Sequence, residues 1–218
     1  MLRVALGMLA AEGVAGFTTR KVAQEADTSP PAVYELFGDK AGLVRELFFE
    51  GFRMLRRRLD RLAATDDARA DLVAVIETMR GFIRKNPVLS QVMFSRPFAD
   101  FDPGPSDVEA GAAVRQFVVE RVRRCTAARL LAGDETDIAH VLVSMTQGLA
   151  ATEVAGWLGS SRASVDRRWD VAIRAVLDGL QPAKRPAARG GAGVASVRVV
   201  GRRRNHESPA REIPAPRG

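Results

Sequence analysis

The chain has 218 residues, and its 33 lysines and arginines against 26 aspartates and glutamates give a formal net charge of +7. Apolar residues make up 46% and charged residues 27% of the chain, which excludes disorder of the whole chain, and no apolar run reaches the length of a membrane-spanning helix. One cysteine and two histidines exclude an internal disulfide and a zinc site of cysteines and histidines, so we expect a cytoplasmic protein without a metal or other cofactor.

The N-terminal part of the sequence predicts three short helices followed by a long one. Three residues with the short polar side chains that helix N-caps require, Thr18, Ser29 and Asp39, each stand directly before a stretch of helical periodicity. Gly13 and Gly38 are typical of helix ends. The predicted helices cover residues 1–12, 18–26, 29–37 and 40 to about 62.

The remainder of the body is also helical in pattern. No stretch alternates apolar and polar residues as a half-buried strand would, and no internal repeat occurs. Further helices are predicted over residues 68–85, 87–95, 107–131, 134–158 and 164–180, with a loop at 96–106. The sequence therefore predicts an all-α protein in three parts: an N-terminal domain (1–48), a C-terminal helical domain (49–181) and a tail (182–218).

The second and third predicted helices have the spacing of a helix-turn-helix motif. They cover 18–26 and 29–37, two residues separate them, and a further helix precedes them. In such a motif the exposed N-terminal half of the second helix of the pair enters the major groove of DNA. Short helix pairs are common in all-α proteins, so the spacing alone leaves a DNA-binding motif and an ordinary helix pair both open.

Two strings of residues cover this helix pair and favour the DNA-binding motif. The strings are TTRKVAQEA at 18–26 and TSPPAVYELFGDKAGL at 28–43. They resemble the TetR/AcrR family of bacterial transcriptional regulators. The resemblance implies an N-terminal three-helix helix-turn-helix domain followed by a helical ligand-binding and dimerisation bundle. It also implies a homodimer that binds double-stranded DNA at a palindromic operator, most often as a repressor.

The resemblance implies roles for individual side chains of the helix pair. Tyr34 would give its hydroxyl to the DNA backbone and Lys40 would bind a phosphate, whereas the alternatives are a packing aromatic and a solvated lysine. Residues at the N-terminus of the first helix of the pair would bind phosphate, and residues at the start of the second helix of the pair would approach base edges. The expected DNA-binding residues are Thr18, Thr19, Arg20, Thr28, Ser29, Pro31, Ala32, Tyr34, Glu35 and Lys40.

The sequence departs from the family pattern in two places. Pro30 stands where a basic residue is frequent in the family. The sequence begins inside the first predicted helix, so either its start is placed too far downstream or the basic stretch that usually precedes this helix is absent. Residues 1–50 carry five basic and seven acidic side chains, for a net charge of −2. A helical small-molecule-binding protein without specific DNA recognition is therefore the alternative function.

The C-terminal domain contains a set of soft and aromatic side chains that predicts an adaptable apolar cavity, or else an ordinary core. A small, apolar ligand is expected there, oriented by the polar members of the set. The expected ligand-pocket residues are Met79, Phe82, Met93, Phe94, Phe117, His140, Met145 and Gln147.

The last two predicted helices carry broad apolar stripes, which are either a dimer surface or internal core. Trp169 is the largest member of one stripe and Leu142 lies in the other. His140 lies within two turns of Asp137 and Ser144 on one helix, which is poor geometry for an activated nucleophile. We therefore expect no catalytic residues and no enzymatic activity.

The positive charge is concentrated in the tail. Residues 51–181 carry 19 basic and 17 acidic side chains, for +2, whereas residues 182–218 carry nine and two, for +7. The tail is rich in proline, glycine and alanine, a composition that cannot bury enough apolar surface to fold. We expect a disordered end that is either merely solvated or a non-specific grip on DNA.

Overall fold

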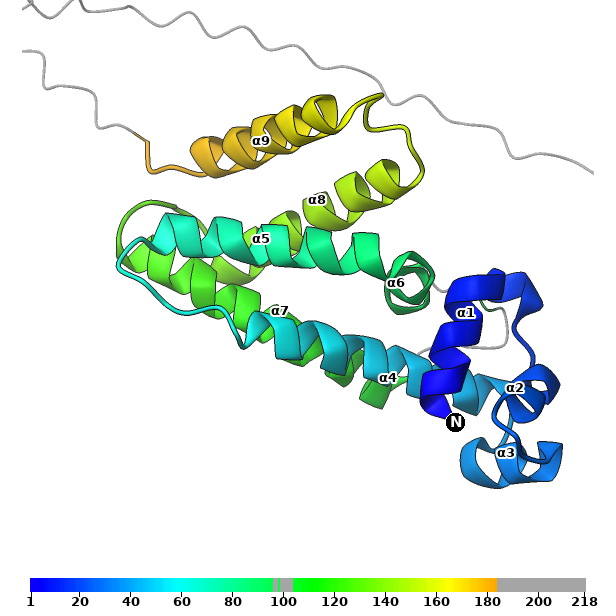
Figure 1. Ribbon diagram of the computed structural model, residues 1–218. Helices are drawn as coiled ribbons and strands as arrows, with labels where there is room; N and C mark the ends of the chain where they lie inside the picture. Colours follow the sequence, from blue (N-terminus) through cyan, green and yellow to red (C-terminus); the bar gives the residue numbers. More distant parts are fainter. Residues whose placement is uncertain (96–97, 99–103, 184–218) are drawn as a thin grey trace, which may run out of the picture. The chain divides into compact units, whose positions relative to one another are not determined.

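The computed structural model describes residues 1–95, 98 and 104–183, and every element assigned within those residues is a helix (Figure 1). The prediction of an all-α protein is confirmed. The helices are α1 (Leu2–Gly16), α2 (Thr19–Glu25), α3 (Pro30–Phe37), α4 (Lys40–Leu59), α5 (Ala68–Lys85), α6 (Pro87–Phe94), α7 (Pro105–Ala127), α8 (Glu135–Val154) and α9 (Arg162–Gly179).

Side-chain caps fix where α2, α3 and α4 begin. The Thr18 hydroxyl accepts a hydrogen bond of 3.3 Å from the backbone N–H three residues further on. The Ser29 hydroxyl and the Asp39 carboxylate do the same, at 3.4 Å and 2.7 Å. Each cap satisfies one of the N–H groups that a helix N-terminus leaves without a partner. The three predicted helix starts are therefore explained by local hydrogen bonds.

Two glycines shape the connections around these helices. Gly13 has φ of 70°, which interrupts α1 where the sequence predicted its end, but the chain then adds a further helical turn up to Gly16. At the start of α4, a Cβ built on Gly42 would lie 1.8 Å from the carbonyl oxygen of Phe37. No side chain fits at Gly42, so α4 begins tightly against the end of α3, and this close approach places Lys40 beside α3.

The later helices follow the predicted ranges with different ends. The helix α7 starts at Pro105, two residues before the predicted start, and it ends near Arg129, which has φ of 57°. The helix α8 ends at Val154 instead of residue 158, because Gly156 adopts φ of 77°, a left-handed conformation that stops a helix. Most of the predicted tail, from residue 184 on, lies outside the described residues.

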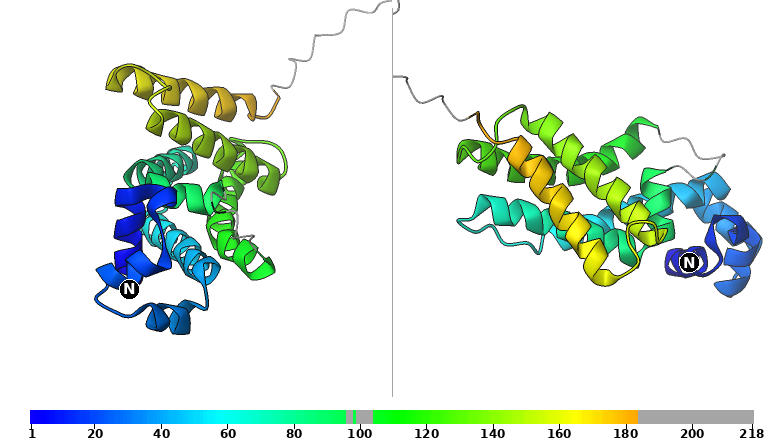
Figure 2. Two further views of the ribbon diagram at one scale, coloured as in Figure 1. Left: turned by 90° about the vertical axis from the view of Figure 1, so that its right-hand side faces the viewer. Right: turned by 90° about the horizontal axis from the view of Figure 1, so that it is seen from above.

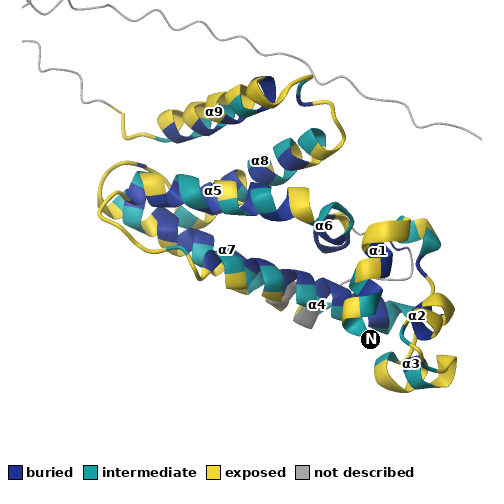
Figure 3. Ribbon diagram, viewed as in Figure 1, coloured by how far each residue is buried: buried dark blue, intermediate teal, exposed yellow. Residues whose placement is uncertain are grey.

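The described residues form one compact unit, Met1–Ala183, in which α4, α5, α7 and α8 pack against one another. The helix α6 contacts α1, α4, α5 and α8, and α9 lies along α8 (Figure 2). One continuous apolar core runs from Val22 and Val33 in the helix pair to Leu72 and Leu142 in the bundle (Figure 3). The boundary predicted between residues 48 and 49 falls inside α4, and it stays a prediction. Among the described residues, no helix has both the length and the apolar character needed to cross a membrane.

Asp71, in the first turn of α5, joins the loop before α5 to α7. Its carboxylate accepts hydrogen bonds of 2.8 Å from both the backbone N–H and the hydroxyl of Thr65. The guanidinium groups of Arg124 and Arg121 on α7 also donate to it, the latter at 3.4 Å. The Thr65 backbone hydrogen bond, the Thr65 hydroxyl and Arg124 together lower the pKa of Asp71 to about 2, although burial opposes this shift.

A second buried network, centred on Arg80 of α5, holds α8 and α9. Arg80 donates to Glu153 of α8 at 2.8 Å and 3.0 Å and to Asp166 of α9 at 2.6 Å. Its guanidinium also lies over the ring of Trp169, 4.8 Å from the centroid, and the Trp169 indole N–H donates to Glu153 at 2.7 Å. Burial alone would raise the pKa of Glu153, but the hydrogen bonds from Arg80 and Trp169 outweigh it and lower that pKa.

Candidate functional site

The helices α2 and α3 form a tight pair whose outer surface is exposed. Asp27 turns the chain between them with φ of 48°, and the N–H of Thr28 donates to the carbonyl oxygen of Ala23 at 2.9 Å. Val33 fixes α3 to the core with no exposed surface, whereas Tyr34 is 50% and Leu36 65% exposed. Figure 3 shows exposed residues along the outward side of α3. This exposed short helix is free to meet a large partner.

The expected DNA-binding residues mostly lie on this surface, with one exception. Thr18, Arg20, Ser29, Pro31 and Glu35 are exposed, and Thr28, Ala32 and Lys40 are half-buried. Thr19 is buried, and its hydroxyl shares a hydrogen bond of 3.3 Å with the hydroxyl of Tyr34. A side chain under α3 is badly placed to reach a phosphate itself. Thr19 instead holds Tyr34, a role that helix periodicity alone does not indicate.

Phe98 connects the segment after α6 to the helix-turn-helix region. Its ring is buried and meets the ring of Phe17 edge-on, with the centroids 5.9 Å apart. The ammonium group of Lys40 lies over the same ring, 5.3 Å from the centroid. A single side chain from beyond α6 therefore contacts both the core below α2 and the first residue of α4.

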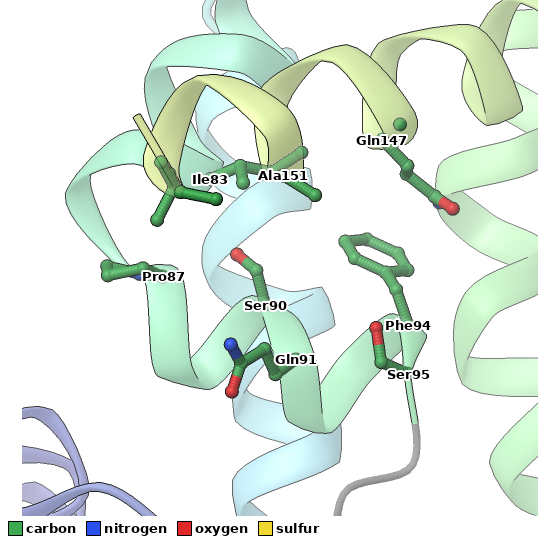
Figure 4. Close-up of a pocket in the computed structure, with 11 residues that line it drawn as sticks. Ile83, Pro87, Ser90, Gln91, Phe94, Ser95, Gln147 and Ala151 are labelled. Carbon is green, nitrogen blue, oxygen red and sulfur yellow. The ribbon is translucent and has the colours of Figure 1, made fainter. Parts of the chain in front are cut away.

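Two neighbouring cavities lie in the helical bundle. The outer cavity has a volume of about 350 Å³ and lies between α5, α6 and α8 (Figure 4). The inner cavity, of about 160 Å³, is lined from α4, α5, α6, α7 and α8. Phe94 and Gln147 line both cavities. Of the expected ligand-pocket residues, Met79 and His140 line only the inner cavity.

Two known families match this chain, one over the helix-turn-helix region and one over the helical bundle. Residues 1–47 match the family described as "Bacterial regulatory proteins, tetR family". Residues 72–176 match the family described as "Tetracyclin repressor-like, C-terminal domain". The chain belongs to the TetR family. It is a DNA-binding transcriptional regulator.

Solved structures share the fold of this TetR-family chain. A protein of unknown function from Rhodococcus sp. RHA1 has 29% sequence identity and a TM-score of 0.72, with 83% of this chain and 93% of that chain covered. A tetR-family regulatory protein from Rhodococcus RHA1 has 20% identity and a TM-score of 0.61, with coverages of 80% and 94%. A TetR variant from Acinetobacter baumannii AYE in complex with minocycline has 16% identity and a TM-score of 0.58, with coverages of 82% and 92%. None of the curated proteins matches the chain.

The other expected pocket residues of this TetR-family chain pack elsewhere. Phe82 has no exposed surface and lies beneath the guanidinium of Arg58, which is 5.1 Å from the ring centroid. Met93 packs against α4, and Met145 is half-buried on α8 without lining either cavity. Phe117 lies between two guanidinium groups of α4 and α7. The outer cavity instead uses Ser90 and Gln91 of α6, whereas the polar members of the expected set, His140 and Gln147, both lie on α8.

The helices α8 and α9 and the loop between them carry exposed apolar side chains, of which Val141 belongs to a predicted stripe. Trp169 and Leu142, from the two stripes, are buried within the chain. The exposed large apolar side chains outside α3 are, with one exception (Leu130), on α8, on α9 or on the loop between them. They are Val141 (49% exposed), Val154 (43%), Trp157 (86%) and Val171 (56%). The buried members of the stripes therefore belong to the internal core, and the four exposed side chains, called the exposed face of α8 and α9, are the candidate contact surface.

His140 is an exposed residue at the border of the inner cavity, and its Nδ1–H donates to the carbonyl oxygen of Thr136 one turn earlier on α8, at 2.8 Å. This contact is within a single helix, so His140 is oriented by its own backbone and not by a catalytic partner. Among the described residues, no group of three or more histidine, cysteine, aspartate and glutamate side chains has the arrangement that holds a metal ion.

Proposed function

We propose that the chain is a homodimeric transcriptional repressor, which binds a palindromic operator and releases it when a small apolar ligand occupies the helical bundle. The observation that carries this proposal is the match of residues 1–47 to the tetR family, on a helix pair whose second member is exposed. A regulator of this kind acts on the chromosome, so we place it in the cytoplasm.

The helix α3 would enter the major groove. Thr28, Pro31 and Ala32 stand at or near its N-terminal end and would approach base edges, with the Ala32 methyl group suited to a thymine methyl. Tyr34 would donate its hydroxyl to a phosphate, and Lys40 would contribute its charge. Thr18, Arg20 and Ser29 would add backbone contacts, and Glu35 would either meet a cytosine amine or stay solvated.

Ligand binding would act on the DNA-binding helices through α6. This helix forms one wall of the outer cavity and also contacts α1 and α4. A Cβ built on Gly51 of α4 would lie 2.5 Å from the sulfur of Met93 on α6, so the two helices touch without slack. A ligand that displaces α6 would therefore move α4 and α1, and would favour a domain spacing that no longer fits the operator.

The exposed face of α8 and α9 would form the dimer interface. An interface between two identical chains related by two-fold symmetry uses the same surface on both, so one apolar face per chain is sufficient. Two copies of α3 related by that symmetry would read two half-sites, which is why a palindrome is expected.

Selection from randomised DNA duplexes by the purified full-length protein tests this function. We expect enrichment of a palindrome whose half-sites are one helical turn apart or a multiple of it. Footprinting on the enriched duplex should then show two protected half-sites. Enrichment of no palindrome at low salt would contradict the proposal.

The same selection addresses the alternative, a helical small-molecule binder without specific DNA recognition. Pro30 favours this alternative, because it stands at the first position of α3 and offers DNA neither an N–H group nor a charge. Ligand binding without any enriched DNA sequence would support it.

A further inference from the structure

We propose that the outer cavity binds a neutral molecule with an apolar body and one oxygen atom, and that this oxygen forms a hydrogen bond with the Ser90 hydroxyl. The regulatory consequence of this binding rests on the proposed function, because only a DNA-binding regulator would convert cavity occupation into operator release. The binding itself follows from the cavity alone.

Ser90 is the residue that points to a ligand. It lies on α6 and is 5% exposed, and its hydroxyl is the one buried side-chain nitrogen or oxygen without a hydrogen-bond partner in the described part of the chain. A serine inside a helix commonly gives its hydroxyl to the carbonyl four residues earlier. Thr146 on α8 does so, donating to the Leu142 carbonyl at 2.7 Å.

The Ser90 hydroxyl instead points into the outer cavity. The carbonyl oxygen of Asn86, four residues earlier, accepts the Ser90 backbone N–H at 2.9 Å but not the hydroxyl. Figure 4 shows the Ser90 oxygen directed toward the space between α6 and α8, below Ile83 and Ala151. Buried hydroxyls are satisfied in native proteins by protein, water or ligand. A ligand oxygen in this cavity would supply the missing partner.

The lining of the cavity selects a neutral ligand. The described residues that line it include Ile83, Pro87, Phe94 and Val154, and none of these described lining residues is Asp, Glu, Lys, Arg or His. An ion buried there would lose its hydration without gaining an opposite charge. Charged side chains occur instead around the inner cavity, where Arg115 contributes to the lining.

The dimensions of the cavity limit the size of the ligand. If each non-hydrogen atom takes about the share of volume of a liquid water molecule, about 350 Å³ holds roughly a dozen atoms. Phe94 separates this space from the inner cavity, and its ring meets that of Phe52 edge-on with the centroids 5.7 Å apart. The apolar end of the ligand would rest on the Phe94 ring while its oxygen meets Ser90.

Isothermal titration calorimetry with three probes of equal atom count tests the ligand class. The probes are 1-nonanol, nonan-2-one and octanoate, titrated into the full chain at pH 7 without DNA. We expect both neutral probes to bind, and octanoate to bind at least about tenfold more weakly, because the cavity offers no counter-charge.

The Ser90→Ala variant tests the position of the ligand oxygen. This variant should bind nonan-2-one about fivefold more weakly than the parent, which is the effect of losing one net hydrogen bond. Ser95→Ala is the matched control, because Ser95 lines the same cavity but is exposed, so that water satisfies its hydroxyl. This control should change the affinity by less than about twofold. Urea unfolding should show Ser90→Ala to be at least as stable as the parent, since it removes a buried hydroxyl without a partner.

Three outcomes would overturn the inference: octanoate binding as tightly as the neutral probes, no binding of either neutral probe, or binding that Ser90→Ala leaves unchanged. Failure of the regulator proposal is recognised separately, because the calorimetry contains no DNA. If the protein enriches a palindrome but binds no neutral probe, only the proposed ligand class is contradicted. If it binds the neutral probes through Ser90 but enriches no DNA sequence, only the regulator proposal is contradicted.

Discussion

The ammonium group of Lys40 lies over the ring of Phe98, 5.3 Å from its centroid, although 58 positions of sequence separate the two residues. Phe98 follows Phe94, the last residue of α6, and Ser95, and both of these line the outer cavity. Lys40 begins α4 next to the exposed helix α3. The side chain proposed to bind a DNA phosphate therefore contacts a residue that stands three positions after the cavity-lining Ser95 in the sequence.

Phe98→Leu should weaken DNA binding without unfolding the protein. Leucine keeps most of the buried apolar volume but removes the ring face, so Lys40 loses a contact worth about 0.5–1 kcal/mol and its preorganisation. We expect a loss of operator affinity of about threefold, measured by fluorescence anisotropy. Lys40→Ala should lower the slope of log binding constant against log salt concentration by about one unit. In the Lys40→Ala background, Phe98→Leu should cause no further loss of operator affinity.

Phe117→Leu is the matched control for the Phe98 variant. Phe117 also supports guanidinium groups, those of Arg56 and Arg121, but it lies in the bundle. The Phe117→Leu variant should have a lower free energy of unfolding than the parent and the same operator affinity. Equal losses of affinity in the two leucine variants would show that Phe98 acts only through general stability.

Tyr34→Phe should weaken operator binding by about tenfold, because a hydrogen bond to a charged phosphate is lost. The loss should be the same for operators of different base sequence, since phosphate contacts carry no sequence information. Thr19→Val removes the hydroxyl that holds Tyr34, and it should reduce operator affinity by less than Tyr34→Phe does. In the Tyr34→Phe background, Thr19→Val should have no further effect, and an additive loss in gel shifts would show that Thr19 contacts DNA itself.

The helix-turn-helix region could be predicted closely because local interactions determine it. The caps Thr18, Ser29 and Asp39 act within three residues of themselves, so their chemistry is readable from the sequence. The end of α8 was less predictable, because Gly156 competes with an apolar pattern that continues to Leu158. The burial of Thr19 depends on where α3 crosses α2, which is tertiary information.

The cavity was not predictable in detail for a related reason. Periodicity tells which face of a helix points inward, but not whether that face meets another side chain or an open space. Phe82 and Phe94 belong to the same predicted set, yet Phe82 packs into the core and Phe94 borders both cavities. Ser90 is visible in the sequence only as a serine in a short helix, and its missing partner requires the packing of α5, α6 and α8.

Trp157 should report the dimer interface. The chain has two tryptophans: Trp169 has no exposed surface, whereas Trp157, in the loop between α8 and α9, is 86% exposed. If the exposed face of α8 and α9 is the interface, acrylamide quenching of the Trp157 emission should fall as protein concentration rises. Trp157→Ala should cost about 2 kcal/mol of dimerisation free energy in sedimentation equilibrium, as buried interface tryptophans do. Leu130→Ala, at another exposed apolar site, should leave the dimer intact, and quenching independent of concentration would place the interface elsewhere.

Asp71 should make stability depend on pH in the acidic range. Its pKa of about 2 in the folded chain lies below its ordinary value of 3.8, so the unfolded state binds the proton first as pH falls. The contribution of Asp71 to the free energy of unfolding is therefore complete above about pH 4, and it is lost as pH falls through about 2. Asp71→Asn should be less stable than the parent at pH 7 in urea unfolding, with the difference shrinking between pH 4 and 2. Asp66→Asn, an exposed aspartate of the same loop, should show no such difference, and a constant gap for Asp71→Asn across this range would contradict the assignment.

Two arginines of α5 reach α9, and their substitution should have very different costs. Arg80 is buried, and Arg80→Met would leave the buried Glu153 with Arg84 and the Trp169 indole as its partners among the described residues. We therefore expect a loss of about 3 kcal/mol of unfolding free energy. Arg69 pairs with Asp178 at 2.5 Å on the surface, and Arg69→Met should cost less than about 1 kcal/mol because solvent screens the pair. Urea unfolding followed by circular dichroism measures both values. Trp169 fluorescence in a Trp157→Phe background should shift to longer wavelength only in the Arg80 variant, because Arg80 covers the ring. Equal, small losses in both variants would show that apolar packing alone holds α9 to the bundle.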